Sequence, residues 1–134
     1  MIRCLNWAMA YSTFEEIPVW QESRNILKKI YVLIKTNPKL RNDFSISDQL
    51  KRASCSILLN ISEGFERSSN TEFAHFLNIA KGSAGEVRAI FYILEDNGYV
   101  QSLELKVLRT EIKEISMHLA NFRKFLLTDK GRKK

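Results

Sequence analysis

Apolar residues recur at steps of three and four along most of the chain, a spacing that predicts long amphipathic helices. The clearest case begins near Ser102, where apolar positions alternate these steps as an a/d seam while the outer face is charged. The seam residues are Leu105, Leu108, Ile112, Ile115, Leu119, Phe122 and Leu126. This pattern predicts a C-terminal helix with one buried stripe.

A first helix is expected to begin at Ile17-Pro18, since proline suits the first helical position, where its missing N–H is no loss. It should end at Asn37-Pro38, because a residue before proline is disfavoured in the α region. Its predicted buried face is formed by Trp20, Leu27, Ile30 and Ile34.

Two further helices are predicted between these. The second should start around Ser45 to Ser47, which are plausible N-caps, and should end at Glu63-Gly64 with Gly64 in the left-handed conformation. In the third, Ser69 and Glu72 have the spacing of a capping box. Asn97-Gly98 provides its C-terminal stop.

Four helices with short connections predict an all-α protein, an antiparallel up-down four-helix bundle over residues 14–127. Residues 1–13 are expected to form an N-terminal extension outside the regular fold, and residues 128–134 a basic tail. Met9 is an alternative start of translation. The N-terminal segment lacks the apolar region of a signal peptide.

Two features exceed the needs of a single bundle. Gly82 and Gly85 each cost roughly 1 kcal/mol relative to alanine inside a helix, so we interpret them as allowing close approach of a neighbouring helix, with local tolerance as the alternative. Segments 31–34 and 90–94 are apolar around the whole helix. This favours a homo-oligomer, unless loops or the N-terminal segment cover the surplus surface.

The composition of the 134 residues, 45% hydrophobic and 27% charged, is typical of a soluble globular domain. The two cysteines, Cys4 and Cys55, have no disulfide or metal-ligand pattern, which favours a reducing, cytoplasmic location. No apolar run approaches the roughly 20 residues that span a bilayer, so no membrane partner is expected.

The net charge of +6 is unevenly distributed. Residues 24–52 carry eight basic against two acidic side chains, residues 123–134 carry six against one, and residues 53–122 carry six against nine. This distribution favours an anionic partner such as RNA or DNA, with ordinary solvated basic helix faces as the alternative. The candidate nucleic-acid-binding residues are Arg24, Lys28, Lys29, Lys35, Lys51 and Arg52.

Candidate enzyme chemistry is weak. Glu72 and His75 have the Glu-x-x-His spacing of di-iron bundles, but the second pair that such a site requires is missing. Glu114 and His118 lie off the apolar seam and indicate a solvated face. No phosphate loop, nucleophile elbow or Cys/His constellation occurs. We therefore predict no enzyme activity, no catalytic residue, no metal and no cofactor.

The densest group of polar residues among apolar ones lies where the second helix ends. Ser56, Asn60 and Glu63 share one side of that helix with Arg52, and Glu86 could meet them from the third helix. The group is either a hydrogen-bonded network that fixes the helix end at Gly64 or a contact surface for a partner.

At these residues the chain resembles the bacterial four-helix-bundle proteins named for 23S rRNA intervening sequences. The resemblance covers residues 14 to about 126 and is most specific in Ser56-Ile57, Asn60-Ile61 and Glu63-Gly64. Gly82, Ser83 and Glu86 also follow the family pattern. The family commonly has Pro-Ala where this chain has Leu58-Leu59.

The resemblance implies a small non-enzymatic protein, similar to the accessory protein of diversity-generating retroelements. That protein forms a basic pentameric barrel and binds nucleic acid and a reverse transcriptase, so the resemblance implies a ring-like homo-oligomer, a pentamer, for this chain. Two hypotheses follow for this chain: a nucleic-acid-associated oligomer that binds the phosphate backbone without base readout, or a protein–protein interaction scaffold with no nucleic-acid role.

Overall fold

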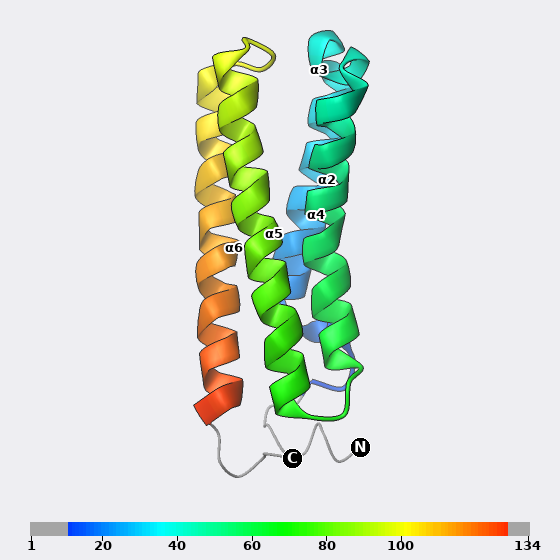
Figure 1. Ribbon diagram of the computed structural model, residues 1–134, viewed down its shortest axis with the longest axis vertical. Coiled ribbons are helices and arrows are strands. Elements are labelled where there is room, and N and C mark those ends of the chain that lie inside the picture. Colours follow the sequence, from blue (N-terminus) through cyan, green and yellow to red (C-terminus); the bar gives the residue numbers. More distant parts are fainter. Residues whose placement is uncertain (1–10, 129–134) are drawn as a thin grey trace.

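The computed structural model describes residues 11–128, which are helical apart from their connections (Figure 1). The elements are η1 (Phe14–Glu16), α2 (Pro18–Thr36), α3 (Pro38–Asn42), α4 (Phe44–Phe65), α5 (Asn70–Asp96) and α6 (Ser102–Thr128). The long helices α2, α4, α5 and α6 run side by side in alternating directions, and α2 and α4 face α5 and α6 across the core (Figure 1). The predicted all-α architecture with four long helices is confirmed; most of the predicted N-terminal extension and basic tail lies outside the described residues.

Prolines set both ends of α2. Pro18 occupies its first turn as predicted, and the helix ends at Thr36 because Asn37, which precedes Pro38, is extended with φ −120° and ψ 99°. Pro38 also begins α3, a short helix that the sequence pattern does not predict. Leu40 of α3 is completely buried, so this turn closes one end of the core.

The buried face of α2 differs partly from the predicted one. Trp20, Ile30 and Ile34 are buried as expected, but Leu27 is only partly buried. Val19, Ile26 and Leu33 are the other buried apolar residues of α2. The difference arises because the run from residue 30 to 34 is apolar on all sides, so spacing alone does not identify the core-facing side.

The prediction that Ser45 or Ser47 caps α4 is wrong. Asp43 is the N-cap, and its Oδ1 accepts a hydrogen bond from the Ile46 amide at 3.3 Å. The other carboxylate oxygen accepts the Tyr99 hydroxyl at 2.8 Å, a bond that raises the pKa of Tyr99. Asp43 therefore ties the start of α4 to the α5–α6 connection, at the end of the bundle where α3 lies (Figure 1).

Gly64 is not a left-handed helix cap, as the sequence analysis expected. It lies inside α4, which continues to Phe65, and it is buried. A Cβ at this position would lie 2.7 Å from Cδ1 of Phe73 and 2.8 Å from Cβ of Phe76. Glycine is required here because α4 and α5 approach closely at this level. The left-handed glycine is Gly98, with φ 67°, which follows α5 at the predicted stop.

The start of α5 is as predicted, since Ser69 is the N-cap and its Oγ accepts the Glu72 amide at 3.1 Å. Inside this chain no helix approaches the mid-helix glycines closely, so close approach of a helix from another subunit stays a prediction. A Cβ at Gly82 or Gly85 would meet nothing within 4 Å, so neither glycine faces a neighbouring helix of the bundle.

The predicted seam of α6 is confirmed. Six of its seven residues are buried, and Phe122 is half-buried. The Phe122 ring packs edge-on against Phe73, with centroids 5.2 Å apart, and Phe73 makes a similar contact with Phe65 at 6.0 Å. These rings join α4, α5 and α6 at the end of the bundle nearest Gly64.

Replacing Gly64 with alanine should destabilise the fold. The added methyl group has no space beside Phe73 and Phe76, and overpacking of this kind costs roughly 1–3 kcal/mol. Gly82→Ala is the matched control: the space is open, and the gain in helix propensity should stabilise by roughly 0.5–1 kcal/mol. Urea unfolding measures both, and equal effects of the two substitutions would contradict the close approach of α4 and α5.

Candidate nucleic-acid interface

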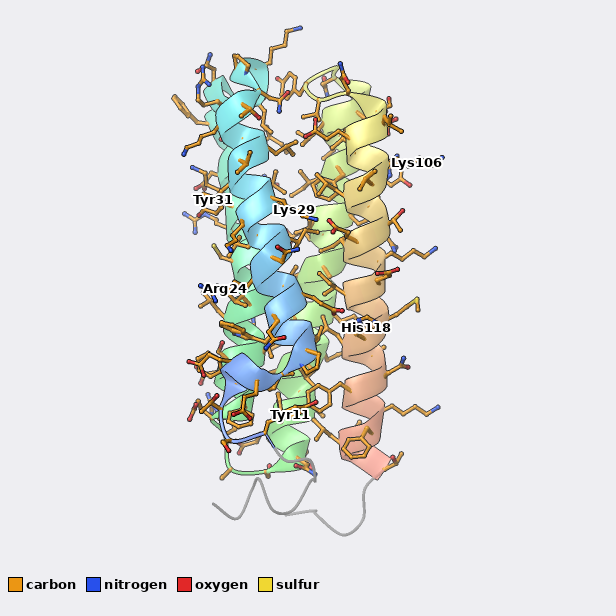
Figure 2. All side chains as sticks on the ribbon, turned by 180° about the vertical axis from the view of Figure 1, so that it is seen from behind. Tyr11, Arg24, Lys29, Tyr31, Lys106 and His118 are labelled. Atoms are coloured by element: carbon orange, nitrogen blue, oxygen red, sulfur yellow. The ribbon has the colours of Figure 1, made fainter. Side chains whose placement is uncertain are left out.

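Three of the predicted cations form a row on the exposed side of α2. Arg24, Lys28 and Lys35 are spaced by four and seven residues, which places them on one side of a helix. Figure 2 shows Arg24 on the side of α2 that is turned away from α6, as is Tyr31. Within residues 11–128, none of these three cations forms an ion pair with a carboxylate.

Aromatic rings lie among these cations. The Arg24 guanidinium lies 5.9 Å from the centroid of the Trp20 ring, and the Lys51 ammonium of α4 lies 5.6 Å from that of Tyr31. Tyr31 Oη is 3.8 Å from Sγ of Cys55, and this hydrogen bond raises the pKa of the tyrosine. We call Arg24, Lys28, Lys35 and Lys51 the α2–α4 basic surface.

The other two predicted cations do not belong to this surface. Lys29 is turned toward α6 (Figure 2), where its Nζ pairs with Glu111 Oε2 at 2.6 Å. Arg52 pairs with Asp48 one turn earlier on α4, with Nε and Oδ2 2.7 Å apart. Each of these cations already has a carboxylate partner, so the structure divides the six candidates into four unpaired and two paired residues.

The polar motif of α4 forms a smaller network than predicted. The Asn60 amide donates to the Ser56 carbonyl at 2.8 Å and to its Oγ at 2.9 Å, and Ser83 Oγ lies 2.9 Å from Ser56 Oγ. Ser83 is buried, so this contact joins α4 to α5 inside the bundle. These three residues therefore have a structural role.

The remaining motif residues lie outside that network. Glu63 pairs with Arg67 at 2.8 Å, Glu86 is exposed, and no hydrogen bond links either of them to Ser56 or Asn60 in the described structure. The end of α4 is fixed instead by the packing at Gly64. The prediction that one network holds all of these residues is therefore wrong.

The described residues contain no group of three or more His, Cys, Asp or Glu that could hold a metal ion. Glu72 and His75 are both exposed. His118, labelled in Figure 2, reaches from α6 to Glu22 of α2, with Nδ1 and Oε1 2.8 Å apart. It therefore pairs across the α2–α6 seam rather than with Glu114.

Sequence reasoning overlooked a division of charge on α6. Lys106, Arg109 and Lys113 line a hollow beside α5, whereas Glu104 and Glu111 line a groove beside α2. The signal was available, because the basic residues are spaced by three and four and so share one side of the helix. When the basic and acidic residues of α6 are treated as one outer face, they indicate only a solvent-exposed side of the helix.

The sequence matches the model of the 23S rRNA-intervening sequence protein family over residues 15–121. The chain belongs to this family. A crystal structure from the S23 ribosomal protein family of Bacteroides thetaiotaomicron, described as a protein of unknown function, is 26% identical and superimposes with a TM-score of 0.74. The match covers 79% of this chain and 98% of that one. No curated protein matches the sequence.

The predicted family is therefore confirmed. Where this family commonly has Pro-Ala, Leu58 packs against the core and Leu59 is exposed, and α4 continues through both without a break. Among the described residues, no helix is both long and apolar enough to cross a membrane.

The contact between Ser56 and Ser83 should contribute measurably to stability. Ser83→Ala is expected to cost roughly 1 kcal/mol, because it removes a buried hydrogen bond. In a double-mutant cycle with Ser56→Ala, the two effects should be non-additive by roughly 0.5–1.5 kcal/mol. Urea unfolding gives the coupling energy. Strictly additive effects would show that the two hydroxyl groups do not stabilise each other.

Proposed function

We propose that this protein is a non-enzymatic, nucleic-acid-associated accessory protein that binds the phosphate backbone. The observation that carries this proposal is the α2–α4 basic surface, where four cations have no carboxylate partner within residues 11–128. Unpaired cations can replace the counterions of a nucleic acid without first breaking an ion pair of the protein.

The chemistry of the surface favours backbone contacts over base recognition. Its cations are exposed or half-exposed along two helices, and Lys28 and Lys51 line two different hollows, so these cations do not converge on one pocket that would read a base. Lysine and arginine contacts to phosphates position a nucleic acid but carry no sequence information. The neighbouring aromatic rings already have partners within the protein: Trp20 donates a hydrogen bond to Ser62 and contacts Arg24, and Tyr31 contacts Lys51. Sequence-independent binding is therefore expected.

The first test replaces the α2 cations as Arg24→Gln/Lys28→Gln/Lys35→Gln and measures affinity for single-stranded RNA over a range of salt concentrations. The slope of log affinity against log salt is negative, and each lost phosphate contact should reduce its magnitude by about 0.7, hence by about 2 for the three contacts. Affinity at low salt should fall by roughly a hundredfold, about 1 kcal/mol for each contact.

The matched control removes the same charge elsewhere, as Lys39→Gln/Lys81→Gln/Lys124→Gln on α3, α5 and α6, where all three lysines are exposed. It should change the slope much less, because the effect requires cations that lie together. Equal losses in both triple variants would indicate only bulk charge. Wild-type protein that binds neither RNA nor DNA at low salt would contradict the proposal.

The second candidate function is a protein–protein interaction scaffold built on self-association. One side of α5 exposes Ile79 by 40% and Ile93 by 44%, and the open positions Gly82 and Gly85 lie between them. Leu59 of α4 is 63% exposed. Small residues among apolar ones would permit close helix packing, so we propose this side of α5 as the subunit contact. A pentameric ring, a reverse transcriptase partner and a cytoplasmic location stay predictions from the resemblance and the composition.

A charge on this side of α5 should therefore disrupt the assembly. Ile93→Glu is expected to shift the mass in solution toward that of the 15.6 kDa monomer, because an oligomer would bury the new carboxylate without a partner. Val107→Glu on α6, exposed by 57% in the groove beside α2, is the matched control and should leave the mass unchanged. Light scattering after size exclusion measures both. A monomeric wild type would rule out self-association.

A further inference from the structure

A hollow of about 680 Å³ opens between α5 and α6, separate from the α2–α4 basic surface. Its lining consists of four basic side chains, one threonine and one tyrosine: Arg88, Tyr92, Lys106, Arg109, Thr110 and Lys113. Lys106 lies on the outer edge of α6, away from α2 (Figure 2). The volume is within the range typical of small-molecule sites.

Four cations around one hollow repel one another. On α6, Arg109 follows Lys106 by three residues and precedes Lys113 by four, so all three are neighbours on the helix surface. Like charges at these spacings destabilise a helix. The arrangement is therefore unfavourable for the fold alone and becomes favourable when an anion lies among the cations.

The acidic residues of α6 do not relieve this repulsion. Glu104 and Glu111 lie in the groove beside α2, and Glu114 lines a second hollow there. On the basic side, Glu95 of α5 accepts Arg109 Nη1 at its Oε1, at 2.8 Å. Within residues 11–128, the other three cations, Arg88, Lys106 and Lys113, have no carboxylate partner.

Arg109 is held in place at the centre of this group. Its side chain is 15% exposed, and its guanidinium lies 4.2 Å from the centroid of the Tyr92 ring in addition to its bond with Glu95. Hydrogen bonds from Ser102 and from Arg109 lower the pKa of Glu95, so that this carboxylate is ionised at neutral pH. A fixed guanidinium loses little rotamer freedom when it binds an anion.

From this geometry we infer that the α5–α6 hollow binds closely spaced phosphate groups, as in a nucleoside triphosphate. Arginine and lysine side chains on two helices face one compact volume, and Thr110 adds a hydroxyl group at its edge. A compact polyanion fits such an arrangement better than an extended strand does. An extended strand matches the row of cations along α2. The inference does not depend on the proposed binding of RNA.

The experiment titrates the full chain with sodium tripolyphosphate and with ATP at low salt by calorimetry, alongside thermal denaturation. Arg88→Gln/Lys113→Gln should weaken binding of both probes by roughly tenfold or more, because it removes two charge-assisted contacts. The control Lys39→Gln/Lys124→Gln removes the same charge from exposed positions outside both basic surfaces, and it should weaken binding by less than about twofold. Without a probe, the melting temperature of Arg88→Gln/Lys113→Gln should be no lower than that of wild type, because the repulsion among the cations of the hollow is relieved.

Two results would overturn the inference. Equal losses of affinity in both double variants would indicate attraction by net charge alone. Binding of the two probes that does not saturate would show that the hollow is not a defined site. The third arm uses single-stranded RNA. If RNA affinity depends on Arg88 and Lys113 while tripolyphosphate does not saturate, the hollow is a backbone contact and not a site for a compact polyphosphate. Loss of RNA binding only in the α2 variants leaves this inference unaffected.

Discussion

The close approach of α4 and α5 at Gly64 is the constraint on which the arrangement of the bundle depends. Four residues connect these helices, so the end of one must pack directly against the start of the other. A missing side chain at Gly64 admits the ring of Phe73, which is 1% exposed and contacts both Phe65 and Phe122. Three helices are thereby joined through one aromatic ring.

The register set at this point determines which residues meet farther along the two helices. Ser83 comes opposite Ser56, and their hydrogen bond continues the α4–α5 contact in the middle of the bundle. The same rotation of α5 directs Gly82 and Gly85 away from the chain and directs Arg88 toward α6. The interior contacts and the features offered to partners are therefore two consequences of one packing geometry.

Helix positions could be predicted from the sequence because prolines, the Ser69 cap and the α6 seam act locally. The cap at Asp43 had a local signal, because Asp43 accepts the Ile46 amide three residues on; only its bond with Tyr99, which is 56 residues distant, required the tertiary structure. Gly64 was misjudged because glycine near a helix end usually signals a left-handed cap, and only the tertiary structure shows Phe73 against it. For the candidate site, the sequence identified the cations. The Asp48–Arg52 pair could have been read from its spacing of four residues, whereas the Lys29–Glu111 pair joins residues 82 positions apart and required the fold.

Pairing explains how a modest net charge yields strongly basic surfaces. The α2–α6 seam is bridged at its edge by Lys29–Glu111 and Glu22–His118, so acidic side chains of α2 and α6 are committed to holding these helices together. The acids of α6 consequently face α2. Of the three α6 cations that face α5, Arg109 is paired with Glu95, whereas Lys106 and Lys113 have no carboxylate partner within residues 11–128. Because helix geometry fixes which residues share a side, placing Glu104 and Glu111 on the seam leaves Lys106, Arg109 and Lys113 together on the opposite edge. The surface charge of α6 thus follows from how the acids are used within the fold.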